Sequence, residues 1–183
     1  MDKAPTRDRI LHATAELFRR QGYTGTGLKA VVAEAGAPFG SLYHHFPGGK
    51  QQLAGEVVHA SGAYFKALVT AIYDAQATTA DSVWSVFAGA AETLERTDYA
   101  DACPVATVAL EVASTDEVLR QATAEVFTAW TDALTERLGG DRDHATAIIC
   151  ALEGAFVLSR ALRSTAPMYA AGRLALAGLR DGE

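Results

Sequence analysis

The sequence predicts an all-α protein of about nine helices, with a small N-terminal three-helix domain and a larger helical body. Alanine, the strongest helix former, supplies about a fifth of the 183 residues, and proline is scarce after Pro47. Apolar residues recur at three- and four-residue steps, and no segment shows the alternation typical of a strand. With 49% hydrophobic and 21% charged residues, the composition indicates a globular chain and excludes a disordered one.

The first three helices are predicted within the first 50 residues. Thr6–Gln21 begins with a threonine that can cap it and ends at Gly22. Thr26–Ala35 follows with the same kind of cap, and Gly36 stops it. The third helix, Pro38–His44, is predicted to open on a proline, whose fixed φ suits the first turn of a helix. Two short helices joined by a tight turn form the layout of a helix-turn-helix, whose second helix lies in the DNA major groove.

The body is predicted to begin with a long helix that opens near Lys50. Its apolar residues recur at helical steps: Leu53, Val57, Tyr64, Leu68 and Ile72. Because no break separates this helix from the motif, we expect it to belong to both domains, residues 1–50 and residues 51–183. Five more helices are predicted at Asp81–Arg96, Cys103–Ala113, Asp116–Leu138, Asp143–Arg163 and Pro167–Leu179.

Charge is distributed unevenly along the chain. The net charge is −6, but residues 1–50 carry seven basic and four acidic side chains, whereas the rest carries nine basic and eighteen acidic ones. A basic head on an acidic body is expected when only the head contacts phosphate. We expect a cytoplasmic protein that binds no membrane, because we find no membrane-spanning run, signal peptide or disulfide framework (the cysteines are Cys103 and Cys150).

The motif resembles the DNA-binding domain of the TetR family. The matching positions, in order, are Gly22, Tyr23, Thr26, Leu28, Val31, Ala35, Gly36, Gly40, Leu42, Tyr43, His45, Phe46 and Lys50. The phrase GSLYHHFPGGK, followed by CPVATVALE at Cys103–Glu111, resembles the LmrA/YxaF-like branch of this family. The resemblance implies a bacterial homodimer that binds double-stranded operator DNA and acts as a repressor. It also implies a small lipophilic effector, bound in the body, that releases the repressor from a palindromic operator.

Candidate DNA contacts combine the motif with side-chain chemistry. Tyr43 and His44 can donate hydrogen bonds to phosphate or base edges, and Lys50 would add an ammonium group to the first turn of the next helix. Packing within the small domain is the alternative for Tyr43. Phe39 can either touch a thymine methyl group or fold back into the domain. The full predicted set is Thr26, Lys29, Pro38, Phe39, Gly40, Ser41, Tyr43, His44 and Lys50.

Two further groups in the body are predicted to bind partners. Small residues at four-residue steps on Asp143–Arg163 permit close packing against a symmetry mate, with packing inside the chain as the alternative. The predicted dimer interface is Ala147, Ala151, Gly154, Leu158, Ala161 and Leu174. Because the resemblance implies an effector cavity, aromatic and polar residues of the body form the second group. The predicted effector-binding residues are Trp84, Phe87, Cys103, Thr107, Glu111, Phe127, Trp130, Glu153 and Phe156.

Three of these residues keep alternatives. Glu111 and Glu153 lie in apolar helical segments, where a carboxylate either bonds an arginine (Arg160 or Arg163) or a hydroxyl, or accepts a hydrogen bond from the effector. Cys103 precedes a proline at the start of a predicted helix. Capping or lining a pocket is favoured there over redox sensing.

Catalysis is not expected, and neither is a metal or cofactor. Glu56 and His59 have the E-x-x-H spacing of di-iron carboxylate bundles, but such sites need a second E-x-x-H and two further acids. The one other acidic residue with a histidine three positions later is Asp141, with His144. This segment follows two glycines and is predicted to lie in a loop. A helical small-molecule carrier without DNA function is the other alternative, and it leaves the basic motif unexplained.

Overall fold

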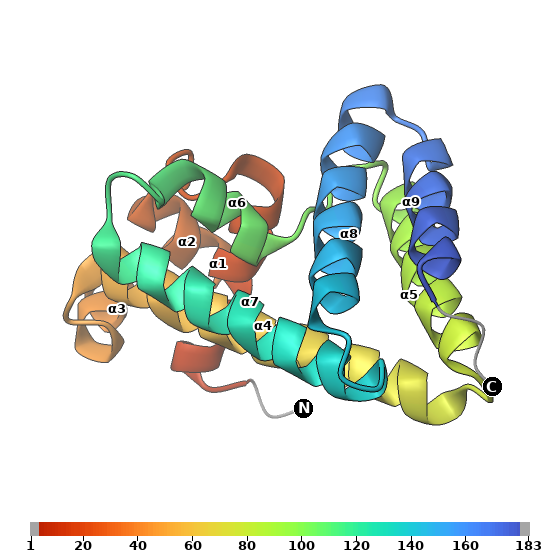
Figure 1. Ribbon diagram of the computed structural model, residues 1–183. Helices are drawn as coiled ribbons and strands as arrows, with labels where there is room; N and C mark the ends of the chain where they lie inside the picture. The colour runs from red at the N-terminus through yellow and green to blue at the C-terminus, as the bar shows by residue number, and fades with distance from the viewer. Residues whose placement is uncertain (1–3, 180–183) are drawn as a thin grey trace. The chain divides into compact units, whose positions relative to one another are not determined.

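The computed structural model describes residues 4–179, which form nine helices and no strand (Figure 1). The predicted all-α class is therefore confirmed, and the helix ends differ from the predicted ones by only one or two residues. The helices are α1 Thr6–Gln21, α2 Leu28–Glu34, α3 Phe39–His45, α4 Gly49–Ala75, α5 Thr79–Arg96, α6 Pro104–Val112, α7 Glu117–Arg137, α8 Arg142–Leu162 and α9 Ala166–Ala177.

The helices form two compact units. Unit 1 comprises the chain up to Ala63 together with Pro104–Val126, and unit 2 comprises Tyr64–Cys103 and the chain from Phe127 onward. Helices α4 and α7 each contribute residues to both units. Unit 1 contains α6, which packs against α1, so this compact unit is larger than the first 50 residues. The functional boundary at residue 50 stays a prediction.

In unit 1, α1, α2 and α3 pack around a small apolar core. Ile10, Phe18, Leu42 and Phe46 are at most 1% exposed and fix the three helices on one another. Glycines end the first two helices as predicted, but both predicted threonine caps are wrong. Pro5 precedes α1 and Gly27 precedes α2, and neither helix start has a side-chain cap.

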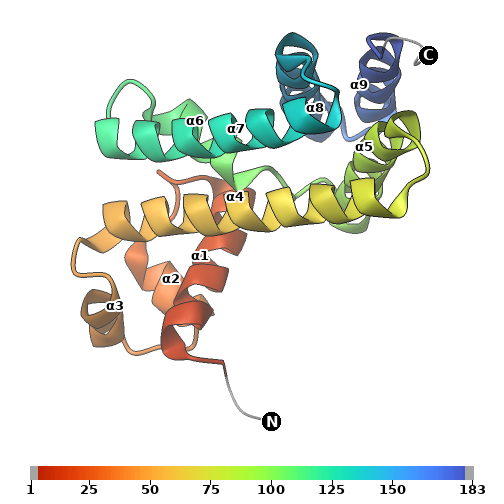
Figure 2. The same ribbon diagram turned by 60° about the horizontal axis from the view of Figure 1, so that its bottom comes forward.

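Within unit 1, helices α4 and α7 pack against each other and run in the same direction (Figure 2). The side chain of Leu119 lies opposite Gly55, and that of Val126 lies opposite Gly62. A β-carbon at Gly62 would stand 2.5 Å from a methyl carbon of Val126, so the absence of a side chain permits this approach.

In unit 2, α5, α8 and α9 pack side by side (Figure 1). Their core includes the fully buried Phe87, Leu94 and Met168, with Leu152 from the inner face of α8. Within residues 4–179, α8 is the one helix long and apolar enough to cross a membrane by length and composition. The hydropathy of α8 is high because apolar residues lie on both of its faces. Leu152 faces the core, whereas Leu158 on the other face is 54% exposed.

The apolar residues that indicated α4 do not all face the core. Tyr64 is 72% exposed and Leu68 is 44% exposed. A neighbouring stripe formed by Phe65, Val69 and Tyr73 packs against the core instead.

Candidate nucleic-acid interface and ligand cavity

Helix α3 presents an exposed aromatic face. Phe39 is 44% exposed and Tyr43 is 48% exposed, and their rings meet edge to face with centroids 5.8 Å apart. The opposite side of the helix is anchored by Leu42, which is fully buried, and by Phe46 just beyond its end. Phe39 therefore does not fold back into the core. The arrangement holds two aromatic side chains outward on a helix that is fixed from behind.

Most other predicted DNA contacts also reach the surface of unit 1. His44 and Lys29 are exposed, and no described atom lies within 4 Å of where a β-carbon of Gly40 would stand. Pro38 is exposed and Ser41 is half-buried. These positions leave the outward side of α3 free to approach another surface closely.

Lys50 lies half-buried in the first turn of α4. Its Nζ stands 4.4 Å from the centroid of the Tyr23 ring, a cation–π contact. Burial lowers the pKa of Lys50, while the carboxylate of Glu111 acts in the opposite direction. The ammonium group is thus positioned by the α1–α2 turn and does not move freely at the end of its side chain.

The predicted phosphate contact of Thr26 needs revision. Its side chain is 1% exposed, and its hydroxyl donates a hydrogen bond of 2.6 Å to the carbonyl of Gly22. Its backbone N–H donates to the carbonyl of Tyr23 at 3.1 Å. Both donors of Thr26 serve the turn between α1 and α2, so we assign this residue a structural role.

Glu111 also has a different role from the predicted one. Its two carboxylate oxygens accept hydrogen bonds from the backbone N–H groups of Tyr23 at 3.0 Å and Thr24 at 2.6 Å. This carboxylate belongs to α6 and lies in unit 1, whereas it was predicted to bind an effector or to bond an arginine or a hydroxyl. The structure instead makes Glu111 a clamp on the α1–α2 turn. The sequence carries no signal for this contact, because the partners are 88 and 87 residues away.

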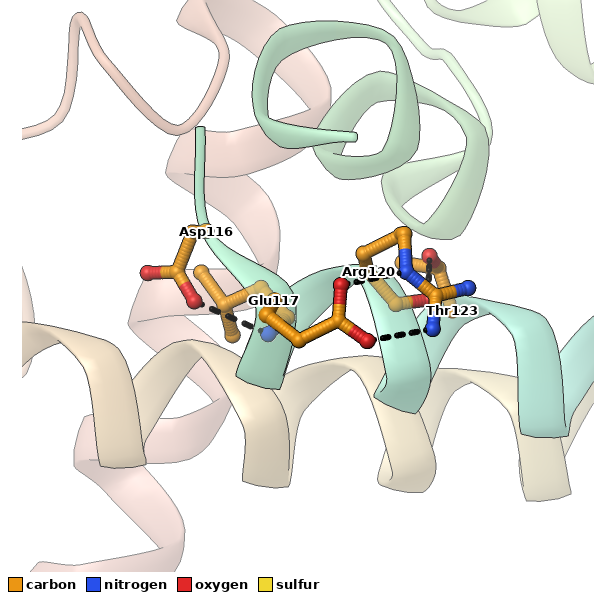
Figure 3. A network of polar contacts seen from close by, with 5 residues as sticks. Asp116, Glu117, Arg120 and Thr123 are labelled. Carbon is orange, nitrogen blue, oxygen red and sulfur yellow. Dashed lines mark hydrogen bonds and ion pairs between the residues drawn. The ribbon is translucent and has the colours of Figure 1, made fainter. Parts of the chain in front are cut away.

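A second carboxylate links α4 to the start of α7. The amide nitrogen of Gln51 donates to both oxygens of Asp116, at 3.1 and 2.9 Å. Asp116 also caps α7 by accepting from the N–H of Leu119 at 3.0 Å (Figure 3). The bond from Gln51 and this backbone bond lower the pKa of Asp116. The carboxylate therefore stays ionised and holds the α6–α7 connection to α4 within unit 1.

Unit 2 contains a cavity of about 320 Å³. Of the predicted effector-binding residues, Phe87 and Trp130 line it. The remaining seven, which lie outside this lining, are Trp84, Cys103, Thr107, Glu111, Phe127, Glu153 and Phe156. Lining residues that the sequence did not single out include Phe65, Val69, Tyr73, Val86, Ile148 and Leu152. The cavity wall is thus mainly apolar and aromatic.

Several of these seven residues have other partners in unit 2. The Trp84 ring lies beside that of Tyr169, with centroids 5.9 Å apart, and Phe127 meets the edge of Trp130 at 5.5 Å. Burial raises the pKa of Glu153 to about 7, and the hydrogen bond from the Cys103 side chain opposes this rise. Thr107, by contrast, lies on α6 in unit 1.

The predicted dimer interface lies at the surface of unit 2. Ala147, Gly154, Leu158 and Ala161 of α8 are exposed, and Leu174 of α9 is 70% exposed. Ala151 is half-buried, and a β-carbon at Gly154 would meet no described atom within 4 Å. Packing inside the chain therefore does not account for these small and apolar residues.

The E-x-x-H residues have partners that explain them structurally. Glu56 bonds the guanidinium group of Arg7 and accepts from the Gln52 amide at 2.9 Å. His59 lies 3.7 Å from a carboxylate oxygen of Glu125. Asp141 is the N-cap of α8. The segment Asp141–His144 therefore begins a helix, whereas it was predicted to lie in a loop. No group of three metal-ligating side chains comes together in the part of the chain that the structure describes.

Comparison with known protein families decides what this arrangement is. The family model "Transcriptional regulator LmrA/YxaF-like, C-terminal domain" matches residues 79–174, more than half of the chain, and "Bacterial regulatory proteins, tetR family" matches residues 10–57. The chain belongs to the TetR family. The predicted family and its LmrA/YxaF-like branch are confirmed, and the chain is a transcriptional regulator and not an enzyme.

Individual TetR-family proteins support the same conclusion along most of the chain. The HTH-type transcriptional regulator LmrA of Bacillus subtilis is 31% identical, over 92% of this chain and 93% of its own length. YxaF of the same organism, also an HTH-type regulator, is 32% identical over 91% of both chains. The solved structure of regulatory protein TetR from Rhodobacter sphaeroides has the same fold, with a TM-score of 0.87, 19% identity and coverage of 96% and 99%.

Proposed function

We propose that this TetR-family regulator is a cytoplasmic dimeric repressor of a palindromic operator. Each subunit inserts α3 into the major groove of one half-site. The observation that carries this proposal is the exposed face of α3, where Phe39 and Tyr43 point outward while Leu42 and Phe46 anchor the helix. Side chains that reach base edges from an anchored helix are what direct readout requires. The excess of basic residues in the first 50 positions favours the approach of phosphate.

Dimerisation would use the exposed small-residue face, defined as Ala147, Gly154, Leu158 and Ala161 of α8, together with Leu174 of α9. Small side chains allow two helices related by a two-fold axis to pack closely. A dimer linked in this way would carry two DNA-binding domains and bind both half-sites at once. Operator affinity would then depend on the distance between these two domains.

The effector we propose is a small lipophilic and aromatic molecule bound in the cavity of unit 2. Phe65, Phe87 and Trp130 of the lining offer aromatic surface to such a ligand. Helices α4 and α7 contribute residues to both the cavity unit and the unit that contains α3. A ligand that favours one arrangement of these helices would change the spacing of the heads and release the operator.

The proposed DNA contact of Lys50 can be tested by Lys50→Ala. We expect weaker operator binding, and a log–log salt dependence that is shallower by about 1, because one phosphate contact is lost. The measurement is fluorescence anisotropy of labelled operator DNA at several salt concentrations. Arg96→Ala is the matched control, because Arg96 is an exposed cation at the end of α5 in unit 2 and does not line the cavity. An unchanged affinity and salt slope in the folded Lys50→Ala protein would remove Lys50 from the interface.

The proposed site of the effector can be tested by tryptophan fluorescence. Trp84 and Trp130 are the two tryptophans of the chain, and only Trp130 lines the cavity. In a Trp84→Phe variant, an effector that releases the operator should therefore change the emission of Trp130. In Trp130→Ala, the effector should lose most of its ability to weaken operator binding, a coupling that is typically about 1–3 kcal/mol. Without effector, this variant should bind the operator normally. Release by a molecule that leaves Trp130 emission unaltered would place the effector elsewhere.

A further inference from the structure

The aromatic pair on α3 places a wholly apolar ring in solvent at the start of the helix. Phe39 is the first residue of α3, and Tyr43 lies one turn further along. Phe39 is 44% exposed, and its ring meets the ring of Tyr43 edge to face with centroids 5.8 Å apart. An exposed phenylalanine leaves apolar surface in contact with water, so covering it with another apolar group is favourable.

Neighbouring residues hold this pair in a fixed position. A β-carbon at Gly49 would stand 3.7 Å from Cε1 of Tyr43, so the edge of the Tyr43 ring lies beside the start of α4. Tyr43 in turn supports the ring of Phe39. A β-carbon at Gly40 would have no atom within 4 Å apart from its chain neighbours and the backbone of its own helix. The backbone next to Phe39 can therefore approach another surface closely.

The position of Phe39 within the motif corresponds to a residue that reaches the bases. In a helix-turn-helix, the second helix lies in the major groove, and its N-terminal residues contact the base edges. Phe39 begins this second helix, and the next residue, Gly40, adds no side chain that would keep the helix away from the groove. The phenyl ring is therefore the apolar group that α3 would bring to the bases first.

The chemistry of the major groove leaves one favourable partner for a phenyl ring. The ring has no N–H, O–H or oxygen atom, so it cannot bond the phosphate oxygens or read the donors and acceptors of the base edges. Thymine alone among the four bases displays a methyl group in this groove. A ring that covered a donor or an acceptor instead would leave that group without a partner, which is unfavourable.

We propose that Phe39 selects a thymine in each half-site by covering its 5-methyl group, while Tyr43 holds the phenyl ring in place. This inference rests on the proposed insertion of α3 into the major groove. It goes further because it names the base that this part of the helix recognises and the group by which it does so.

Replacing thymine by uracil tests this proposal, because uracil lacks only the 5-methyl group. The probe is a duplex that the wild-type protein selects from a random DNA library, with each thymine replaced in turn. We expect one thymine in each half-site at which uracil weakens binding about 4-fold, the contribution of one buried methyl group. Replacing both of these thymines should weaken binding about 16-fold. Fluorescence anisotropy at several salt concentrations should show an unchanged salt dependence, because no phosphate contact is lost.

Variants of position 39 show whether Phe39 makes this contact. Phe39→Ser should bind the thymine duplex and the matching uracil duplex equally, whereas Phe39→Leu, which keeps an apolar side chain, should retain the preference for thymine. Tyr64→Ser removes an exposed aromatic ring from α4 and should behave like the wild-type protein. Because the side chain of Phe39 lies outside the core, Phe39→Ser should melt close to the temperature of its parent.

The possible outcomes separate this inference from the proposed function. A wild-type protein that is indifferent to every replacement of thymine by uracil would overturn the inference and leave operator binding intact. The same holds if Phe39→Ser keeps the full preference for thymine. If the wild-type protein selects no sequence from the library, the proposed operator binding is wrong as well.

Discussion

Replacing Gly154 with leucine is expected to convert the dimer into a monomer and to lower operator affinity by about 10²- to 10⁴-fold, the range by which linking two binding modules raises avidity. Gly154 lies on the exposed small-residue face of α8, where an added β-carbon would have no atom within 4 Å apart from its chain neighbours and the backbone of its own helix. A leucine there should leave the subunit intact but separate the two helices that we propose to pack across a two-fold axis. Sedimentation velocity at low micromolar concentration and operator anisotropy measure the two effects.

The matched control is Gly89→Leu. Gly89 is an exposed glycine inside α5, and it also has no described atom within 4 Å of an added β-carbon. This variant should remain dimeric and should bind the operator like the parent protein. A Gly154→Leu protein that sediments as a dimer with normal affinity would show that the subunits associate through another surface.

Replacing Gly22 with alanine is expected to destabilise unit 1 by about 3–5 kcal/mol. Gly22 has φ 79° and ψ 174°, a region that essentially only glycine occupies, and forcing another residue into it costs about 1–3 kcal/mol. In addition, a β-carbon would stand 2.1 Å from a carboxylate oxygen of Glu111. The carboxylate would have to leave the N–H groups of Tyr23 and Thr24, and a hydrogen bond to a charged group contributes about 1.5–3 kcal/mol.

Urea denaturation of single and double variants separates these two contributions. In a Glu111→Ala background the collision is absent, so Gly22→Ala should cost only the backbone part, about 1–3 kcal/mol. Gly89→Ala, inside a helix and in open space, should be neutral or slightly stabilising. If Gly22→Ala costs the same with and without Glu111, the carboxylate does not clamp this turn.

The sequence by itself determined the helices and the family. Helices arise from patterns within one segment, and glycines such as Gly22 and Gly36 stop them wherever the chain needs a positive φ. The helix-turn-helix is also local, because its residues lie within one short stretch. For the same reason the exposure of Tyr43 and His44 on α3 agrees with their predicted position at the DNA-binding surface.

Only the tertiary structure decided which of several plausible partners each side chain has. Thr26 can cap a helix or bond the preceding turn, and its hydroxyl reaches the Gly22 carbonyl because packing holds that turn close. Glu111 bonds backbone groups nearly half the chain away, a pairing that no spacing pattern encodes.

The lining of the cavity is likewise not encoded in any local sequence pattern. Helix α4 carries two adjacent apolar stripes in its second half, one through Tyr64 and Leu68, the other through Phe65, Val69 and Tyr73. Periodicity favours both stripes equally, because each recurs at helical steps. The second stripe faces the core because α5, α7 and α8 supply the residues that pack against it, and these residues come from distant parts of the sequence. Burial is a property of the assembled helices, so the position of Tyr73 among the residues that line the cavity could be found only from the fold.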